Sequence, residues 1–510
     1  MQTEISELKT EIVELKALVK YYEEQFRLSR HRQFGSSSEK SEYDFEQTAI
    51  FNEPELLADA NTLEPELIEI EKHYRKRTRL TTDKLPEDLP VEIVEHELPE
   101  EERVCPECGD KMHVMGQDSR RELVIIPAQV KVREHIRKIY SCRSCERDKD
   151  DVPIIKAPLP EPVIKGSFAS PEAISQIMTQ KFVMGVPLYR QEQEWKRQGI
   201  ELSRQTMSNW LIKATEDWLE PIYDALHELL YSRDCLHADE TTLQVLHEPG
   251  KTAQSKRYMW LYRTSGDTNH PIVLYDYQPD RRAKRPKEFL TDFKGYLHTD
   301  GYDAYHKLIE GDITVVGCWA HVRRKFDEAL KSIPEHSRAD SLALRGKRYC
   351  DKLFEFERVF AELAPGERFT KRQELSKPLV AEFFAWVKSC GAIPKSGTGK
   401  AAYYAISQQK YLERYLQDGR LEISNNRAER SIKPFVIGRK NFLFANTPRG
   451  AKASAVIFSL VETAKECGID PFRYLTYVFE SAPGWDIRNN ADMLRLLLPT
   501  SLQAKDKEAV

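Results

Sequence analysis

The first segment of the chain carries a heptad pattern of apolar residues. Within residues 1–34, apolar side chains alternate three- and four-residue steps, at Ile5, Leu8, Ile12, Leu15, Val19, Tyr22 and Phe26. This spacing forms the a/d seam of a coiled coil. A lone amphipathic helix of this length is marginal in water, so its seam needs a partner. We therefore expect self-association through residues 1–34, with packing onto the chain's own body as the alternative.

A polar and acidic stretch follows the heptad segment. Residues 35–100 are rich in glutamate and aspartate and are interrupted by proline, as in EPELLADANTLEPELIEIE. Such a composition buries too little apolar surface to form a core. We expect residues 35–100 to be a flexible linker.

Residues 151–230 show helical periodicity. The Ser170-Pro171 pair predicts a helix start, because serine caps an N-terminus and proline fits the first helical position. Gly199 and Ser203 predict a turn and then a second short helix, RQTMSNW, which is helix-turn-helix geometry. The side chains expected to face a DNA groove are Arg204, Gln205 and Asn209. A small helical bundle that does not contact DNA would show the same pattern.

From residue 235 the pattern becomes an alternation of period two. CLHADETTLQV, KRYMWLYRT and PIVLYDYQ predict three strands, followed by a helix, RPKEFLTDF, and two further strands, GYLHTDGYDAY and ITVVGCWAHVRRKF. Three antiparallel strands, a helix and further strands are the element order of an RNase H-like α/β fold. We expect residues 231–325 to form the first part of such a core.

Helical periodicity returns between residues 326 and 420, which predicts a helical insertion into the core. Within it, SGTGKA resembles a nucleotide-binding loop, but the first glycine of that motif would fall at Pro394, and Lys400 is followed by alanine. A capped helix start is the better interpretation, and Lys400 is then a candidate DNA contact. The second part of the core is expected at 421–485 and a tail at 486–510. The chain is thus predicted to be a multidomain α+β protein.

Composition excludes several classes of protein. Apolar residues make up 40% and charged residues 31% of the chain. No apolar run reaches the roughly eighteen residues of a membrane span, and no secretory segment precedes the heptads. The net charge of −4 averages an acidic stretch at 39–71 with basic stretches at 281–287, 323–325 and 427–452. DNA responds to the local patch, so the net charge does not exclude DNA binding. We expect a cytoplasmic protein that is nucleoid-associated when it binds DNA.

Four of the nine cysteines form two close pairs. Cys105-Pro-Glu-Cys108 and Cys142-Arg-Ser-Cys145 each direct two sulfurs at one point, and two such turns complete a tetrahedral zinc site. The other five are scattered, which favours a reducing compartment over a disulfide framework. We expect a four-cysteine zinc ribbon at 101–150. Its four thiolates leave no position for water, so the zinc would be structural.

Two aspartates lie at the ends of predicted strands. Asp239 follows His237 by two residues, and Asp300 follows His298 by two. Period two places each histidine and aspartate on the same face of its strand. In an RNase H-like arrangement the two strands are neighbours, so both carboxylates would meet at one edge.

A third acid is expected on a helix. NNRAERSIKP opens a helix whose first turns carry Glu429, and Lys433 lies one turn further on the same face, where it can meet a phosphate. Hard divalent cations, Mg²⁺ or Mn²⁺, prefer carboxylate oxygens. Two ions about 4 Å apart would activate a water or a 3′-hydroxyl and stabilise the leaving oxygen at phosphorus. Each acid taken alone is more typical of a solvated side chain, whereas their joint placement indicates a metal site.

Together these motifs resemble the transposases of the insertion-sequence sixty-six family. The matching segments are HADET, HTDGYDAY, GCWAHVRRKF, NNRAERSIKPF, the heptads, SRHRQFGSSSEK, CPECG, FVMGVPLYRQEQEW and LSRQTMSNW, which cover nearly the whole chain. The resemblance implies DDE chemistry: nicking of element ends at terminal inverted repeats and joining of the exposed 3′-hydroxyls to target DNA. It implies Asp239, Asp300 and Glu429 as the triad, and companion proteins encoded by the same element.

A Cys-x-x-His element, Cys318 to His321, resembles one found in several DDE families with helical insertions. A second zinc site would have only these two visible ligands. We therefore expect His321 to support the active site, as His237 and His298 do, and Cys318 to lie in the core. The basic residues expected to contact phosphate are Arg323, Arg324, Lys325, Arg427, Arg430, Arg439, Lys440 and Arg449, the last ones on a loop beside the acids.

Three other functions share parts of this pattern. A metal-dependent nuclease or resolvase without strand joining would use the same triad but would not need the heptads, the zinc module or the insertion. A transposase-derived DNA-binding regulator would have lost an acid, and none is lost here. A metallohydrolase that uses His237 and His298 would favour zinc or iron over magnesium.

Overall fold

The computed structural model describes residues 130–141, 154–266, 270–310 and 312–502. The chain forms two compact units, one of residues 38–159 and one of residues 1–37 with 160–510. The predicted coiled coil, the linker and all four cysteines of the zinc ribbon, Cys105, Cys108, Cys142 and Cys145, lie outside the described residues. In the first unit, strands β1 (Ile139–Ser141) and β2 (Ile154–Lys156) pair antiparallel. No helix within the described ranges is long and apolar enough to cross a membrane.

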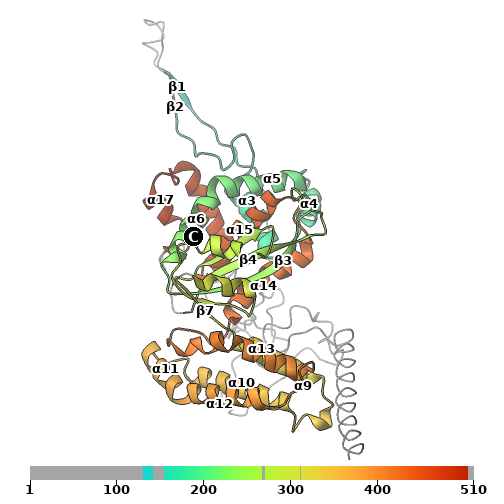
Figure 1. Ribbon diagram of the computed structural model, residues 1–510. Helices are drawn as coiled ribbons and strands as arrows, with labels where there is room; N and C mark the ends of the chain where they lie inside the picture. The colour runs from blue at the N-terminus through green and yellow to red at the C-terminus, as the bar shows by residue number, and fades with distance from the viewer. Residues whose placement is uncertain (1–129, 142–153, 267–269, 311, 503–510) are drawn as a thin grey trace, which may run out of the picture. The chain divides into compact units, whose positions relative to one another are not determined.

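A five-stranded mixed sheet forms the centre of the second unit (Figure 1). Its strands are β3 (Cys235–Gln244), β4 (Lys256–Thr264), β5 (Val273–Gln278), β6 (Gly295–His298) and β7 (Ile313–Val316). Their order across the sheet is β5-β4-β3-β6-β7. The first three strands are antiparallel, as expected for consecutive strands with short connections, whereas β6 and β7 run parallel to β3.

The last two strands are shorter than the sequence predicts. β6 ends at His298, and the residues that follow form a turn and the short helix α8 (Asp303–His306). β7 ends at Val316, and CWAHVRRKF continues as helix α9 (Trp319–Lys331), not as a strand. The buried residues of α9 are Trp319, Val322, Phe326 and Ala329. Their spacing of three and four residues is helical, and this periodicity outweighs the short alternation in GCWAHV.

Helices from both ends of this unit pack around the sheet (Figure 1). On the N-terminal side they are α3 (Pro171–Phe182), α4 (Leu188–Arg197), α5 (Arg204–Ala214) and α6 (Glu220–Tyr231), with a π-helical turn at Thr215–Leu219 that joins the last two. Helix α7 (Lys284–Phe289) connects β5 to β6. On the C-terminal side they are α14 (Asn426–Phe442), α15 (Pro448–Glu466), α16 (Pro471–Ser481) and α17 (Ala491–Leu496).

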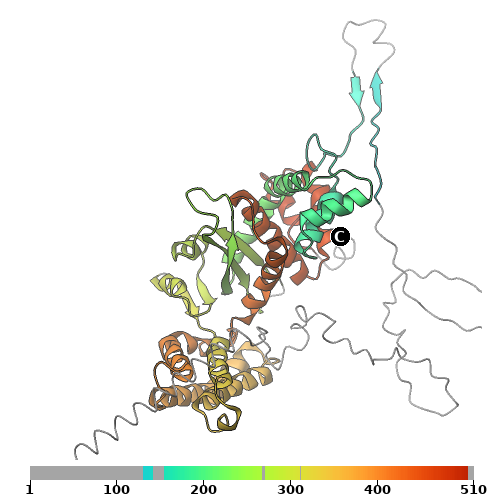
Figure 2. The same ribbon diagram turned by 90° about the vertical axis from the view of Figure 1, so that its right-hand side faces the viewer.

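The outer strand β5 is covered by α15, which runs beside it (Figure 2). The backbone N–H of Val273 donates to Thr463 Oγ1 at 3.0 Å, and that hydroxyl donates to Val273 O at 3.1 Å. The N–H of Tyr275 donates to Ser459 Oγ at 2.7 Å. Side chains of α15 therefore satisfy edge groups that would otherwise be open to pairing with another strand.

A second hydrophobic core lies among the helices inserted between β7 and α14. These helices are α9, α10 (Leu342–Val359), α11 (Pro365–Lys371), α12 (Lys377–Ser389) and α13 (Gly397–Leu412), which gather in one body in both ribbon views (Figures 1 and 2). Cys235 of β3 and Val316 of β7 also belong to this core. The insertion is thus packed directly onto the sheet.

Helix starts follow the capping signals in the sequence. Ser170 caps α3, Ser203 caps α5 and Ser396 caps α13, each accepting a hydrogen bond from the backbone N–H three residues later. The segment SGTGKA is therefore the capped start of α13. The turn before α5 contains Gly199 with φ of +79°, a conformation that favours glycine.

Candidate active site

The parallel ladder between β3 and β6 places the two predicted aspartates. Its last paired residues are His237 and His298, whose rings stack with centroids 4.4 Å apart and an interplanar angle of 12°. Asp239 and Asp300 each follow two residues later. Asp239 lies in the middle of β3, not at its end, because β3 continues to pair with β4 as far as Gln244. Both aspartates thus follow the end of the pairing between β3 and β6. Only Asp300 also follows the end of its own strand, as the sequence predicts for both.

Charge and burial show how these acids affect one another. Burial raises the pKa of Asp239 well above its usual range, and the negative charges of Glu240, Asp300 and Glu429 raise it further. Coulombic effects weaken with distance, so these charges act from nearby positions. The four carboxyl groups therefore lie in one region of the fold, where the other three disfavour the ionised form of Asp239.

Glu429 lies in the first turn of α14, as predicted, and α9 fixes its side chain. Arg324 Nη2 donates to Glu429 Oε2 at 2.9 Å, and His321 Nδ1 lies 3.6 Å from Glu429 Oε1. Cys318, at the start of α9, is buried, as predicted. The Cys-x-x-His element thus meets the third acid.

A buried polar network joins the sheet to the segment that precedes α14. Asn425 Nδ2 donates to Ala238 O at 2.8 Å, and Asn425 Oδ1 lies 3.0 Å from His237 Nδ1. Glu422 Oε1 lies 3.6 Å from His237 Nε2, and the Glu422 N–H donates to His298 Nε2 at 3.3 Å. Burial would raise the pKa of Glu422, but the adjacent His237 and Arg427 hold it well below its usual range. His237 and His298 therefore belong to a buried network that joins β3 and β6 to the segment before α14.

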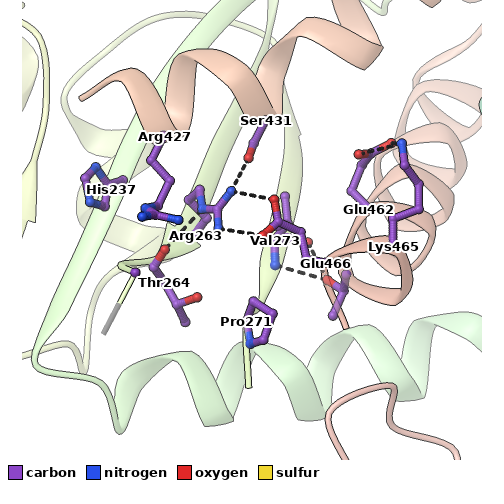
Figure 3. A network of polar contacts seen from close by, with 12 residues as sticks. His237, Arg263, Thr264, Pro271, Val273, Arg427, Ser431, Glu462, Lys465 and Glu466 are labelled. Carbon is purple, nitrogen blue, oxygen red and sulfur yellow. Dashed lines mark hydrogen bonds and ion pairs between the residues drawn. The ribbon is translucent and has the colours of Figure 1, made fainter. Parts of the chain in front are cut away.

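A second set of polar contacts, centred on Arg263, fastens α14 and α15 to the sheet (Figure 3). The buried Arg263 of β4 forms a two-pronged ion pair with Glu466 of α15, with N–O distances of 3.0 and 3.1 Å. Its guanidinium also donates to the hydroxyl of Ser431, two residues after Glu429. Because a guanidinium makes several fixed hydrogen bonds, Arg263 restrains the position of α14 against β4.

Four residues of this site were missed by the sequence reasoning. They are Glu240, which is bound by Arg281 and Tyr305, together with Arg263, Glu422 and Asn425. Asn425 directly precedes the NRAER helix start and Glu422 lies three residues before Asn425, so the polar start of this helix is the signal that could have found them. Glu240 lies beside Asp239, and nothing in the pattern distinguishes it from a solvated acid.

Several of the predicted DNA contacts bind other residues of the chain. Arg323 pairs with Asp351 at 2.5 Å, Arg427 donates to Glu422 at 2.7 Å, and Lys325 Nζ lies 4.6 Å from the centre of the Tyr404 ring. Arg439 donates to the side chains of Thr241 and Thr242 on β3, and Arg449 pairs with Glu216. Arg439 and Lys440 lie in the last turn of α14, and Arg449 lies in the first turn of α15. The expected basic loop is therefore two helix ends.

The other predicted contacts are exposed. Arg204, Gln205 and Asn209 lie on the outer face of α5, where Gln205 Nε2 donates to Asn209 Oδ1 at 3.2 Å. Arg204 is held near α4 by its backbone N–H, which donates to Glu192 Oε1 at 2.9 Å. The other predicted DNA contacts that are exposed are Lys400, Arg430, Lys433 and Lys440.

Four protein-family models match this chain. The Transposase IS66 family matches residues 166–453, and the zinc-finger binding domain of transposase IS66 matches residues 102–146. The model described as transposase C of IS166 homeodomain matches residues 21–94, and the IS66 C-terminal element matches residues 459–499. The matches begin before the cysteine pairs and continue beyond the Glu429 helix.

Similar proteins and one solved structure were also found. An uncharacterized protein of Sinorhizobium fredii, y4qI, is 32% identical over 409 residues, which is 77% of this chain and 72% of that protein. A second uncharacterized protein of the same organism, y4jD, is 29% identical over 434 residues, 82% of each chain. The Drosophila P element transposase strand transfer complex is similar over 58% of this chain and 93% of that chain, with 11% identity and a TM-score of 0.33. Since the principal family model covers more than half of its residues, this chain belongs to the IS66 family of transposases.

Proposed function

We propose that this chain is a DDE transposase. It would cleave DNA at the terminal inverted repeats of its element and join the exposed 3′-hydroxyls to target DNA. The observation that carries the proposal is that acids from three separate elements lie near enough for the charges of Asp300 and Glu429 to act on Asp239. Asp239 and Asp300 follow the last residue pair between β3 and β6, and the charge of Glu429 on α14 acts on Asp239.

The sheet supports an RNase H-like core. Three antiparallel strands are followed by two strands parallel to the first, in the order β5-β4-β3-β6-β7. This is the topology that places the first and fourth strands side by side. The insertion enters after β7, so the acid-bearing helix α14 returns to the sheet from a distant part of the chain.

The donor set fits Mg²⁺ or Mn²⁺. Asp239, Asp300 and Glu429 offer only carboxylate oxygens, which hard divalent cations prefer. Burial, and then the charges of Glu240, Asp300 and Glu429, raise the pKa of Asp239, so a bound cation would favour its ionised form. Bound ions would supply activation of a water or 3′-hydroxyl and stabilisation of the leaving oxygen. The protein's own residues position the carboxylates. Arg324 holds Glu429, and His237 with His298 locks the two aspartate strands in register.

Further parts of the proposal concern partners. Arg204, Gln205 and Asn209 on α5, with Lys400, Arg430, Lys433 and Lys440, would contact DNA. Cys105, Cys108, Cys142 and Cys145 would hold the zinc of the matched zinc-finger domain. The heptads at 1–34 would join chains into a homo-oligomer. Companion proteins of the element are further expected partners.

The test is cleavage and joining of a labelled oligonucleotide that carries the element's own end, with full-length protein and Mg²⁺. We expect the wild type to release 3′-hydroxyl ends and join them to a target duplex. Asp300→Asn should lower both rates by at least about a hundredfold, because the acids act as a unit. The control is Asp303→Asn, three residues away, whose side chain is 90% exposed and which should retain wild-type rates.

Each other outcome identifies a different function. Cleavage without joining by the wild type would indicate a nuclease or resolvase. DNA binding by both proteins without cleavage, even after companion proteins are added, would indicate a regulator. Cleavage that survives Asp300→Asn would show that the triad assignment is wrong.

A further inference from the structure

A group of three potential metal ligands lies where α9 meets α14. Cys318 immediately precedes α9, His321 is in its first turn, and Glu429 is in the first turn of α14. One ligand atom from each residue lies within 4.8 Å of the others. Cys318 is 2% exposed, and the other two side chains are only about one-fifth exposed. The sequence shows only two of these ligands, because the third lies more than a hundred residues further along the chain.

Two polar atoms of this group are buried and lack a hydrogen-bond partner among the described residues. They are His321 Nδ1 and Glu429 Oε1, which face one another at 3.6 Å. A buried polar atom without a partner costs free energy. A cation between the two atoms would satisfy both, because an imidazole nitrogen and a carboxylate oxygen each offer a lone pair.

The third ligand identifies the class of cation. A thiolate, an imidazole and a carboxylate together favour Zn²⁺ over Mg²⁺, which prefers oxygen. Bond lengths of about 2.0–2.3 Å in a tetrahedral zinc site place ligand atoms roughly 3.5 Å apart. Since the three atoms lie within 4.8 Å of one another, they need to approach by at most about 1.3 Å, within the reach of a side-chain rotation. Three protein ligands would leave one position for water.

The surroundings of Cys318 suit a metal-bound thiolate. The backbone N–H of Asn425 donates to Cys318 Sγ at 3.1 Å. When a zinc–sulfur bond forms, the S–H bond breaks and the proton passes to solvent, so charge and atoms balance.

We propose that Cys318, His321 and Glu429 form a second zinc site, distinct from the zinc-finger domain, and that zinc bound there inhibits cleavage. The second part rests on the proposed function, because Glu429 is shared with the catalytic triad. Glu429 Oε2 accepts from Arg324, and Oε1 faces His321. With zinc on Oε1, both oxygens are engaged on the α9 side, and the magnesium site loses a ligand.

To test zinc binding, full-length protein is equilibrated with buffered free Zn²⁺, and the number of zinc ions bound per chain is then measured. We expect the wild type to hold about one more zinc than Cys318→Ser or His321→Gln. The matched controls are Cys350→Ser, a buried cysteine of α10, and His306→Gln, a half-buried histidine stacked on Tyr411; both should hold wild-type zinc. Two ligand variants are used so that one remains informative if the other does not fold. Equal zinc content in all folded variants would overturn the proposal.

The inhibition half is tested by adding Zn²⁺ to the Mg²⁺-supported cleavage reaction, with each protein compared with its own zinc-free rate. Cys318→Ser should need at least about tenfold more zinc for half-inhibition, since it lacks one ligand. Unchanged zinc sensitivity in a variant that has lost the extra zinc would overturn the shared-ligand model. If the wild type shows no cleavage even after companion proteins are added, the proposed function fails, but the zinc stoichiometry still decides the site.

Discussion

Asn425 is a single buried side chain that connects three elements of the site. Its amide contacts β3 through Ala238 O and His237 Nδ1, its N–H donates to Cys318 beside α9, and it directly precedes α14. Asn425→Ala would leave the Ala238 carbonyl and the His237 nitrogen unpaired in the core. We expect a loss of about 2–4 kcal/mol in the free energy of unfolding, together with a lower cleavage rate because Glu429 shifts.

The neighbouring residue provides the control for this prediction. Asn426 begins α14 and is partly exposed, so Asn426→Ala should change thermal stability little. Thermal melting and cleavage rates of both variants would be compared with those of the wild type. If Asn425→Ala behaves as Asn426→Ala does in both assays, the positioning role assigned to Asn425 is wrong.

Asp276 on β5 makes stability depend on pH. Burial raises its pKa to about 6, although Gln278 Nε2 donates to its carboxylate at 2.8 Å. An aspartate in the unfolded chain titrates near pH 4, so between about pH 4 and 6 the unfolded state loses the proton first. Stability therefore falls as pH rises through this window, and the penalty is complete above it.

Replacing Asp276 with asparagine removes this penalty. Asp276→Asn should stabilise the protein at pH 8 by about 1–3 kcal/mol, towards the lower figure because the carboxyl is partly exposed. The gain should largely disappear near pH 4, where both states of the wild type hold the proton. Melting temperatures at the two pH values, with the highly exposed Asp492→Asn as control, would check this. An equal shift at both pH values would contradict the role of ionisation.

At the scale of elements, the sequence predicts what local patterns determine. Alternation and helix capping depend on neighbours in the chain. They predict strands β3, β4 and β5 and the serine-capped starts of α3, α5 and α13. The ends of β6 and β7 do not. Both strands stop where parallel pairing stops, at His298 and Val316, and that limit is set by the partner strands.

The same distinction applies to the candidate site. Period two placed His237 and Asp239 on one face, and the helix start at NNRAER placed Glu429 in a first turn. The link between Asn425 and Ala238 joins residues 187 positions apart, so no local pattern reveals it. Likewise, an arginine in a basic stretch, such as Arg439, is typical of a DNA contact. In the fold, however, Arg439 donates hydrogen bonds to Thr241 and Thr242 of β3. Long-range contacts, not residue types, decide these roles.

Helix α14 carries exposed cations, which we expect to contact DNA, and a partly buried arginine that bonds to the sheet. Arg430 and Lys433 are exposed and lie three residues apart on one face. The double variant Arg430→Ala/Lys433→Ala should reduce the slope of log affinity against log salt by roughly 2, about 0.9 for each lost phosphate contact. Arg439→Ala, on the same helix, should lower thermal stability and leave the slope unchanged. Fluorescence anisotropy with a labelled duplex over a salt series would measure both slopes, and identical slopes for all proteins would rule out this DNA face.

At the scale of the whole molecule, the insertion does more than separate two parts of the core. Helix α9 packs its apolar face into the second hydrophobic core, while its Arg324 and His321 reach Glu429 on a helix of the first core. The position of the third acid therefore depends on how the two cores pack. A change within the insertion can alter the active site without touching the sheet.

The predicted coiled coil should decide how many such active sites act together. Joining two element ends to one target requires two active sites in one complex, and the heptads at 1–34 are the segment expected to pair chains. Leu8→Asp/Leu15→Asp places charges in the a/d seam, so we expect sedimentation to shift to the monomer. Joined products that contain both ends should then be lost, while cleavage of a single end persists.

The control for the seam changes the outer face of the same helix. In the predicted heptads Thr10 and Ala17 fall at f positions, seven residues apart, which a coiled coil would turn away from its seam. Thr10→Asp/Ala17→Asp adds the same charge and should keep both the assembly and two-ended joining. A seam variant that sediments as the wild type does would place the contact between chains elsewhere in the molecule. A monomer that still joins both ends would show that assembly occurs on the DNA, because two bound ends would then bring the chains together.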